Sequence, residues 1–492
     1  MRKGAGGLTP VITLDRRSDK PLHKQLYEGF CAAILERNLR PGQRVPSTRS
    51  LAVELRISRI PVLNAYSQLL AEGYFQARSG SGTFVSSSLP SQWTSAEPRG
   101  RGFPTLPSAP RPLSKKSALL PAYKPDPWMN KWGAFIVGQS AFEHFPFKVW
   151  SSVLTRHIRN VPMTSLYYGD PMGSDRFRAT IAAYLRTARA VKCDASQIMI
   201  VNGSQQALEL CARVLLDRED RVWIEEPGYR LARYVFVMTG CRLVPVPVDE
   251  EGLNVAKGIK LSPKARAAFV TPSHQFPLGC AMSVSRRLQL LDWARRSGAW
   301  IIEDDYDSEY RYESLPIASL QGLDRNSRVI YIGTFSKTLF PSLRLGYIVI
   351  PADLVDRFCA VRQASDVFPP YLHQAALNDF IAEGHFARHI RRTRLLYAER
   401  RNVLVEAIRK EFGTSVGVHG AEAGVHLALT LESGGRDVSI SKRAAREDLW
   451  LWSLSSCYLE KPRQGFILGF GSTAPGDISK AVAHLRSIVK SQ

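Results

Sequence analysis

The sequence predicts two folds in one chain of 492 residues: a small, mainly helical N-terminal domain and a larger α/β domain with a mainly parallel sheet. Three observations support this division. Short helical patterns and a strand pair fill the N-terminal region, a stretch rich in Pro, Ser, Gly and Arg follows, and strand-like and helical runs then alternate to the end. We therefore expect domains at 16–86 and 128–492, joined by a flexible linker at 87–127.

Positive charge is concentrated at the N-terminal end. The chain has a formal net charge of +22, and its first 130 residues hold 19 Lys and Arg against 8 Asp and Glu, which is half of the excess. This asymmetry indicates an anionic partner for the N-terminal domain, with nucleic acid favoured over a membrane surface. A basic surface that serves only solubility is the alternative on charge alone.

Cysteine usage and hydropathy bear on the compartment. Seven cysteines are scattered without a Cys-x-x-Cys pair, which is typical of reduced thiols in a cytoplasmic protein, and we expect no metal site. No stretch approaches the ~18 consecutive apolar residues of a membrane span. The N-terminus also lacks the apolar run of a signal peptide. We expect a cytoplasmic protein that makes no membrane contact.

Three helices are predicted in the N-terminal domain. The first spans 21–36, where apolar residues recur at helical spacing. The second begins at Ser47 and the third at Ser58, each of which is a plausible N-cap. Gly73 ends the third helix, whose apolar stripe is expected to consist of Val62, Tyr66, Leu69 and Leu70.

A strand pair completes this domain. Residues 74–78 and 83–85 alternate like strands around a glycine-rich tip at 79–82. Helix, helix, tight turn, helix and hairpin form a winged helix-turn-helix, whose third helix enters the major groove of double-stranded DNA by its N-terminal end. Glycines let the wing approach phosphates closely. The expected DNA-binding residues are Arg49, Ser58, Arg59, Arg78, Gly80 and Gly82. A protein-docking module with surface arginines is the alternative.

The motifs of this domain resemble those of the GntR-type DNA-binding domain. One position departs from that family, because Ile60-Pro61 replaces the polar Asn-Thr pair that usually follows Ser-Arg and so removes polar base-reading groups. The resemblance covers about 65 residues and is carried by Pro21-Leu22-x-x-Gln25-Leu26-Tyr27, Leu39-x-Pro41-Gly42-x-x-x-Pro46-Ser47-x-Arg49-x-Leu51-Ala52, Ser58-Arg59, Glu72-Gly73-Tyr74 and Gly80-Ser81-Gly82-Thr83-Phe84-Val85.

Four loops of the large domain carry candidate ligand-binding groups. In a parallel sheet flanked by helices, ligands lie at the carboxyl ends of the strands, and all four loops fall there. Each loop alone has an ordinary explanation, such as a helix cap, a packing tyrosine or a solvated ion pair. The four together indicate a site; they are Asn202-Gly203-Ser204-Gln205, Glu226-Pro227-Gly228-Tyr229, Asp304-Asp305-Tyr306, and Gly333-Thr334-Phe335-Ser336-Lys337 with Arg344 at its far end.

The residue types in these loops suit an aldehyde cofactor that carries a phosphate. A loop lysine forms a Schiff base with an aldehyde, and hydroxyls with an arginine hold a phosphate. The helix that starts at Ser204 offers free N–H groups to an anion. Tyr229 could stack on a flat ring, and a carboxylate such as Asp304 could pair with a protonated ring nitrogen.

These loops are similar to those of the fold-type-I aminotransferases, which use pyridoxal 5′-phosphate (PLP). The resemblance covers roughly residues 130–490 and implies the PLP-dependent transferase fold. By that analogy Lys337 is the catalytic lysine that carries PLP, Asp304 pairs with the ring nitrogen, Tyr306 pairs with the ring hydroxyl and Tyr229 stacks on the ring. The phosphate is assigned to Ser204, Gln205, Thr334, Ser336 and Arg344.

Two departures from the aminotransferase pattern bear on chemistry. Phe276 precedes Pro-x-Gly where aminotransferases usually have Asn, and Ile467 stands where they place the arginine for the substrate carboxylate. Arg463 is a candidate substitute for that arginine. Loss of a bidentate carboxylate clamp weakens amino-acid affinity and orientation. We therefore favour a regulator that performs Schiff-base formation or a half-reaction over an enzyme that turns over amino acids.

A GntR-type reader joined through a long linker to such a domain resembles the MocR/GabR family of bacterial regulators. Thr271-Pro272-Ser273-His274-Gln275-Phe276-Pro277-x-Gly279 and Glu303-Asp304-Asp305-Tyr306-Asp307-Ser308-Glu309-Tyr310-Arg311-Tyr312 resemble that family's motifs. The resemblance implies a head-to-tail homodimer whose PLP domain senses an amine, an amino acid or PLP itself and repositions the DNA-binding arms. Two alternatives stay open: an active aminotransferase with an accessory DNA-binding arm, and a plain repressor whose large domain serves only dimerisation.

Overall fold

The computed structural model of the chain describes residues 12–87, 112–124, 129, 131–312, 317–432 and 436–491. The chain forms two compact units, Met1–Pro112 and Leu113–Gln492. Most of the predicted linker, residues 88–111, lies outside the described residues. Within its last part, the 3₁₀ turn η1 (Ser117–Leu119) packs against α7 (Arg230–Thr239) and belongs to the C-terminal unit. The boundaries 16–86, 87–127 and 128–492 stay predictions.

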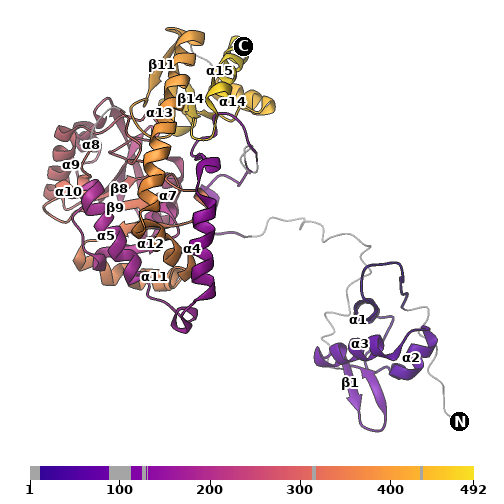
Figure 1. The fold of residues 1–492 in the computed structure, drawn as a ribbon. Helices are drawn as coiled ribbons and strands as arrows, with labels where there is room; N and C mark the ends of the chain where they lie inside the picture. The colour runs from indigo at the N-terminus through magenta and orange to yellow at the C-terminus, as the bar shows by residue number, and fades with distance from the viewer. Residues whose placement is uncertain are drawn as a thin grey trace. The chain divides into compact units, whose positions relative to one another are not determined.

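The N-terminal unit consists of three helices and a two-stranded sheet (Figure 1). The Ser47 hydroxyl accepts a hydrogen bond from the Ser50 amide at 3.1 Å and caps α2, as predicted. Ser58 occupies the N-cap position of α3 without a side-chain cap bond. This arrangement is the predicted helix-turn-helix with a β wing; its elements are α1 (Leu22–Leu35), α2 (Thr48–Glu54), α3 (Arg59–Ala71), β1 (Phe75–Arg78) and β2 (Gly82–Val85).

Aromatic packing holds this unit together. The rings of Phe30, Tyr66 and Phe75 meet edge to face with centroids 5.1–5.5 Å apart, which joins α1, α3 and β1. The Tyr66 hydroxyl donates to the Pro46 carbonyl at 2.9 Å and ties α3 to the start of α2. The prediction that Leu70 joins the α3 stripe was wrong, because Leu70 is 37% exposed and Ala65 takes that place in the core.

A mixed sheet of eight strands forms the centre of the C-terminal unit. The pairs β4–β5, β4–β7, β7–β8 and β8–β9 are parallel, whereas β10 runs antiparallel to both β9 and β3. The mainly parallel α/β fold is therefore confirmed. In spatial order the strands are β3 (Ile198–Val201), β10 (Gly346–Val349), β9 (Val329–Thr334), β8 (Trp300–Asp305), β7 (Ala267–Val270), β4 (Arg221–Glu226), β5 (Arg242–Asp249) and β6 (Gly252–Leu253).

Both faces of the large sheet are covered, which explains its near-continuous apolar strands. Successive residues point to opposite faces, so that Ile302 and Ile330 pack in one buried cluster while Ile301 and Val329 pack in another. The helices of this unit are α4 (Phe147–Arg159), α5 (Asp175–Arg189), α6 (Ser204–Leu215), α7, α8 (Val255–Leu261), α9 (Val284–Ser297), α10 (Leu320–Leu323), α11 (Val355–Ser365), α12 (Tyr371–Ala382), α13 (His385–Phe412), α14 (Asp437–Ala444) and α15 (Pro475–Lys490).

A smaller antiparallel sheet lies in the C-terminal part of this unit. Figure 1 shows the long helix α13 running from the region of α12 towards this sheet, and α13 packs against α15. The strand order is β11 (Val416–His419), β12 (His426–Leu431), β14 (Gly465–Gly469) and β13 (Trp452–Ser453). None of the helices in the described ranges combines the length and the apolar character that a membrane crossing requires.

Candidate functional site

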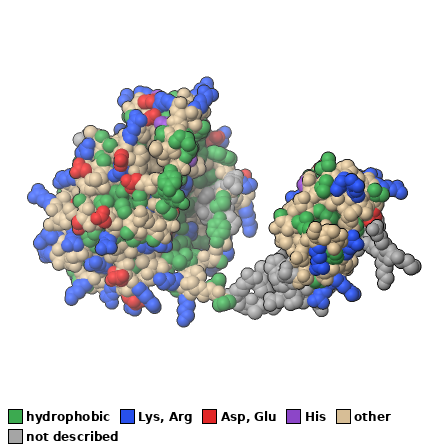
Figure 2. All heavy atoms as spheres, turned by 90° about the horizontal axis from the view of Figure 1, so that it is seen from below, with side chains coloured by type: hydrophobic (Ala, Val, Ile, Leu, Met, Phe, Trp, Pro, Cys, Tyr) green, Lys and Arg blue, Asp and Glu red, His purple; other side chains and the backbone are tan. Residues whose placement is uncertain are grey.

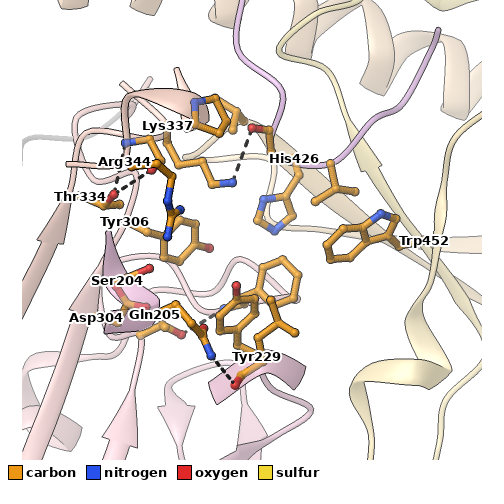
Figure 3. Close-up of a pocket in the computed structure, with 18 residues that line it drawn as sticks. Ser204, Gln205, Tyr229, Asp304, Tyr306, Thr334, Lys337, Arg344, His426 and Trp452 are labelled. Atoms are coloured by element: carbon orange, nitrogen blue, oxygen red, sulfur yellow. Dashed lines mark hydrogen bonds between the residues drawn. The ribbon is translucent and has the colours of Figure 1, made fainter. Parts of the chain in front are cut away.

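A cavity of about 370 Å³ lies at the carboxyl ends of the central strands. Its walls come from the loops after β4, β7, β8 and β9, from the start of α6, from the segment with Val137 and Gly138, and from β12 and β13 of the small sheet. The structure brings all nine predicted cofactor residues together here: Ser204, Gln205, Tyr229, Asp304, Tyr306, Thr334, Ser336, Lys337 and Arg344. In Figure 3 the labelled side chains surround one common space.

Lys337 reaches this space from the loop between β9 and β10. Its ammonium group lies 3.5 Å from the Gly138 carbonyl, and a Cβ on Gly138 would come within 2.3 Å of the same nitrogen. Gly138 also has a φ angle of 80°, in the left-handed region that favours glycine. Removal from bulk water lowers the pKa of Lys337, while the nearby charges of Asp307 and Asp304 oppose that effect. A lowered pKa favours the nucleophilic, unprotonated amine.

Asp304 is the penultimate residue of β8 and is almost fully buried, with 4% of its surface exposed. Burial, followed by the neighbouring charges of Asp305 and Asp307, raises the pKa of Asp304 to about 7. Its Oδ1 atom has no hydrogen-bond partner among the described residues. A buried acceptor without a partner is costly, so this atom suits a ligand that brings a hydrogen-bond donor.

Two tyrosines border the same space. Tyr229 stands at the start of α7, and its ring meets the Phe276 ring edge-on at 5.7 Å. The Tyr306 hydroxyl lies 3.1 Å from Nδ1 of His274. Burial, with the charges of Asp307 and Asp304, raises the pKa of Tyr306 well above its usual value, so that the phenol keeps its proton at neutral pH.

The groups predicted to hold a phosphate gather at one end of the cavity. Ser204 begins α6, a helix of 12 residues whose first N–H groups have no intrahelical partners. The Thr334 hydroxyl donates to Ser336 Oγ at 3.0 Å and accepts from the Ser336 amide at 3.2 Å. The Arg344 guanidinium donates to the Asn202 carbonyl at 2.6 Å, which joins the β9–β10 loop to the start of α6. Hydroxyls, a guanidinium and a helix start are groups that can bind an anion, and the end of the cavity where they lie is called the anion-binding end.

The antiparallel strand β10 explains why Arg344 joins this group. In a parallel arrangement the amino end of a strand would lie at the opposite edge of the sheet. Because β10 is antiparallel to β9, Gly346 pairs with Thr334, and the residues just before β10 lie beside the residues just after β9. The whole segment from Thr334 to Arg344 therefore faces the same edge.

Phe276 lines the cavity and belongs to an apolar cluster whose other buried members do not line it. Ile467, in β14, is fully buried and packs in one cluster with Phe276, Leu454 and Cys457. Both departures from the aminotransferase pattern thus meet in a single apolar cluster. Arg463 lies exposed just before β14 and is not among the residues that line the cavity.

Sequence reasoning missed several residues of the cavity wall. Phe276 was noticed only as a departure from a motif, through its place before Pro-x-Gly. His426 gave a weak signal, as a single polar residue in an apolar strand run. Thr271 begins a quoted motif but was not assigned to the site. The others carry no motif: Val137, Gly138, Leu231, Pro341, Val425 and Trp452.

The N-terminal unit presents its candidate residues on the surface. The Arg59 guanidinium donates to the Thr48 hydroxyl at 3.1 Å, which brings the starts of α3 and α2 together. Arg78 lies over the Phe84 ring at 4.7 Å, beside the wing tip. On the face shown in Figure 2, basic side chains gather on this unit and acidic ones are few. The six predicted DNA-binding residues, Arg49, Ser58, Arg59, Arg78, Gly80 and Gly82, are all exposed.

Backbone geometry supports the predicted wing tip. Gly80 and Gly82 have φ angles of 71° and 106°, in the left-handed region where glycine is favoured. A side chain on Gly82 would also come within 3.2 Å of Arg44. At the start of α3, Ile60 is 67% exposed, so the residue that replaces the usual polar one projects into solvent.

Comparisons with known proteins define the class of the chain. Residues 137–452 match the family model "Aminotransferase class I and II", and residues 22–85 match "Bacterial regulatory proteins, gntR family". The structure of Pyrococcus horikoshii kynurenine aminotransferase in complex with PMP aligns with a TM-score of 0.70 and 25% identity, over 77% of this chain and 97% of that one. The protein is thus a helix-turn-helix transcriptional regulator with an aminotransferase-like domain.

Relatives along the whole length identify the family. The chain is 41% identical over 479 residues to the "Probable rhizopine catabolism regulatory protein MocR" of Rhizobium meliloti, covering 97% of this chain and 95% of that protein. It is 35% identical to the HTH-type transcriptional regulator YhdI of Bacillus subtilis, covering 98% of both chains. The chain belongs to the MocR/GabR type of transcriptional regulators, and the predicted resemblance is confirmed.

Proposed function

We propose that the C-terminal unit binds PLP through Lys337 and senses an amine, an amino acid or PLP itself, and that this event changes how the N-terminal unit binds double-stranded DNA. One observation carries the proposal: nine residues chosen from four separated loops line the same cavity, with the lysine among them. The regulator class comes from the family; the cofactor, the sensing event and the roles of the residues are inferred.

The residues present fit PLP at each of its polar ends. The unpartnered Oδ1 of Asp304 suits the ring N–H, and the Tyr306 hydroxyl is available to the ring hydroxyl. The hydroxyls of Ser204, Thr334 and Ser336 lie with the Arg344 guanidinium at the anion-binding end. The fit rests on the donor and acceptor types of side chains that line the cavity.

The chain's own residues then have defined tasks. When bound, PLP supplies an aldehyde carbon and an electron-withdrawing ring. Lys337, whose pKa is lowered by burial, supplies the amine that attaches to the cofactor and takes up or returns a proton when a competing amine arrives. Asp304 keeps the ring nitrogen protonated, because a buried carboxylate beside a cation favours the charged pair.

The apolar cluster that contains Phe276 and Ile467 favours sensing over turnover. An aminotransferase orients its amino-acid substrate through a bidentate arginine–carboxylate pair. Here Ile467 and Phe276 occupy the corresponding positions and pack against each other in the same buried cluster. We infer that a response to the ligand, and not steady transamination, is the role of this domain.

The proposal also includes the partners. The exposed Arg49, Arg59 and Arg78 are assigned to promoter DNA, and the protein is proposed to act as a head-to-tail homodimer, as the family resemblance implies. Each half of the promoter site would then be bound by the N-terminal unit of one subunit. Ligand binding needs to change the affinity for DNA by only ~1–3 kcal/mol to act as a switch.

The test combines cofactor mapping with DNA binding. The purified full-length protein is incubated with PLP, reduced with borohydride and digested, and the pyridoxyl group is located by mass spectrometry. We expect it on Lys337. Genomic DNA fragments that bind to the protein are isolated, and the affinity of the protein for them is then measured with and without added amines. Absence of the adduct at Lys337 contradicts the cofactor assignment, whereas rapid steady-state transamination without DNA would favour an enzyme.

A further inference from the structure

The outward face of α3 carries two apolar side chains that are not among the predicted DNA-binding residues. Ile60 is 67% exposed and Leu63 is 40% exposed. They stand three positions apart, which places them on one side of the helix, and together they are called the apolar pair. The opposite side of α3 packs into the core, and its buried residues are Val62, Ala65, Tyr66 and Leu69. The apolar pair therefore faces away from the protein.

The start of α3 offers few polar groups at this point. The Ile60 side chain has no donor or acceptor, and Pro61 has no backbone N–H. Pro61 does not interrupt the helix, because the N–H groups of a first turn have no intrahelical acceptor. This part of the helix is therefore suited to contact an apolar group of its partner.

Exposed arginines lie on the elements that pack against α3. Arg49 is in α2 and Arg78 ends β1, and both elements contact α3. Arg59 is held at the start of α3 itself, where its guanidinium donates to the Thr48 hydroxyl at 3.1 Å. Such cations suit the phosphates on either side of a DNA groove. The charge around Ile60 therefore favours DNA over an apolar protein surface as the partner.

The major groove of DNA offers one apolar group that matches this face. Of the four bases, only thymine has a methyl group on its major-groove edge, whereas a G·C pair presents hydrogen-bond donors and acceptors there. An isoleucine placed against those polar groups would remove them from water without replacing their hydrogen bonds, which is costly. Contact with a thymine methyl group instead buries apolar surface of both partners.

We propose that Ile60, with Leu63 beside it, contacts the 5-methyl group of a thymine in the major groove, so that each half of the promoter site contains an A·T pair recognised by this methyl group. This inference rests on the proposed function, in which the N-terminal unit binds promoter DNA. Ile60 thereby determines specificity, whereas arginines that contact phosphates contribute affinity without sequence information.

The experiment removes the methyl group and keeps every hydrogen-bonding group of the base. A DNA fragment that the full-length protein binds is selected from random sequences, and each thymine of the bound region is replaced in turn by deoxyuridine. Fluorescence anisotropy at fixed salt measures the affinity for each fragment. In each half of the site we expect a position at which the replacement weakens binding about fourfold, which corresponds to roughly 0.8 kcal/mol for one buried methyl group.

Variants connect this effect to one side chain. Ile60→Ala should weaken binding to the thymine fragment and make the deoxyuridine replacement at that position neutral. Ile60→Val, which keeps branched methyl groups, should retain part of the effect. The matched control is Leu70→Ala, because Leu70 is an exposed apolar residue at the other end of α3, about 15 Å along the helix axis. Thermal unfolding verifies that the N-terminal unit is folded in each variant.

The salt dependence of binding separates this contact from the arginine contacts. An apolar contact releases no counterions, so Ile60→Ala should leave the slope of log affinity against log salt concentration unchanged. Arg78→Ala should make that slope shallower by about one, because its charge no longer displaces a counterion from a phosphate. A slope that is equally shallow in Ile60→Ala would overturn the inference, since the variant would then have lost a charged contact.

The outcomes are distinct. If the protein binds a selected fragment but no thymine is sensitive to loss of its methyl group, or if Ile60→Ala keeps that sensitivity, the inference is overturned and the proposed function stands. If Ile60→Ala changes the oligomeric state of the free protein and leaves the thymine effect as in the wild type, the apolar pair belongs to a protein contact, and the inference is again overturned. If the wild type binds no DNA fragment, the DNA-binding part of the proposed function fails and this inference fails with it.

Discussion

The two units present their candidate chemistry in opposite ways. In the N-terminal unit all six predicted DNA-binding residues are exposed and lie within one short stretch of chain. In the C-terminal unit the nine predicted cofactor residues come from four loops and meet in a cavity. Charges on the first surface act through water and are screened by salt, whereas charges in the cavity change pKa values. Burial separates the two sets most clearly at Asp304 and Lys337, whose pKa values are shifted, whereas no such burial applies to the exposed arginines of the N-terminal unit.

The largest expected effect concerns the cavity of the C-terminal unit. Lys337→Ala should remove the pyridoxyl adduct completely, because no other amine in the described residues lines the cavity. Added PLP should also stop raising the unfolding temperature, since a ligand stabilises only through the state that binds it. Reduction and peptide mapping measure the first effect and thermal scans the second. Lys192→Ala, at an exposed lysine, is the control and should behave like the wild type.

The next effect concerns a buried charge. The folded pKa of Asp304 is about 7 against an ordinary 3.8, so the folded protein holds a proton that the unfolded chain has released. Stability from this group is present at low pH and is lost as pH rises towards 7. At about 1.4 kcal/mol per pKa unit, the loss amounts to roughly 4 kcal/mol at most.

Asp304→Asn should therefore raise the unfolding temperature of the cofactor-free C-terminal unit at pH 8 and change it much less at pH 5. The same variant should retain PLP poorly, because the ring nitrogen loses its carboxylate partner. Thermal unfolding at the two pH values and a retention assay measure both results. If the unfolding temperature of Asp304→Asn changed between pH 5 and pH 8 as much as that of the wild type, the assignment of the buried charge would be contradicted.

On the exposed side the expected effect is smaller. Arg59→Ala should weaken binding to a selected DNA fragment by about 1–3 kcal/mol. Cofactor binding should be unchanged, since Arg59 belongs to the other compact unit. Fluorescence anisotropy at fixed salt measures the first quantity and cofactor absorption the second. Lys24→Ala, at an exposed residue of α1, is the control. Loss of cofactor in Arg59→Ala would refute the division into two independent sites.

The smallest expected effect tests the fold of the N-terminal unit alone. Ser47→Ala removes the hydroxyl that accepts from the Ser50 amide and caps α2. The loss of this cap should lower the stability of the unit by about 1 kcal/mol. Ser58→Ala should cost less stability, because the Ser58 side chain makes no cap bond. Thermal unfolding of both variants, followed through the transition of this unit, measures the difference.

Local patterns were sufficient to predict the fold and the motifs. Helix starts such as Ser47 are specified by residues close in sequence, and the strand end predicted at Asp304 lies one residue before the end of β8. Leu70 was placed in the core because periodicity alone does not fix the edges of an apolar stripe. His426 and Trp452 could not be assigned to the cavity, since they reach it only when the small sheet docks beside the large one.

The antiparallel return from β9 to β10 has one further consequence. Thr334 and Gly346 are partners in the ladder, so the segment between them is anchored at both ends to the middle of the sheet. Lys337, the Thr334 and Ser336 hydroxyls and Arg344 thus belong to one continuous segment, whereas Ser204 comes from α6. Residues 335–345 could therefore be exchanged as a unit between relatives without a change in the order or pairing of the strands.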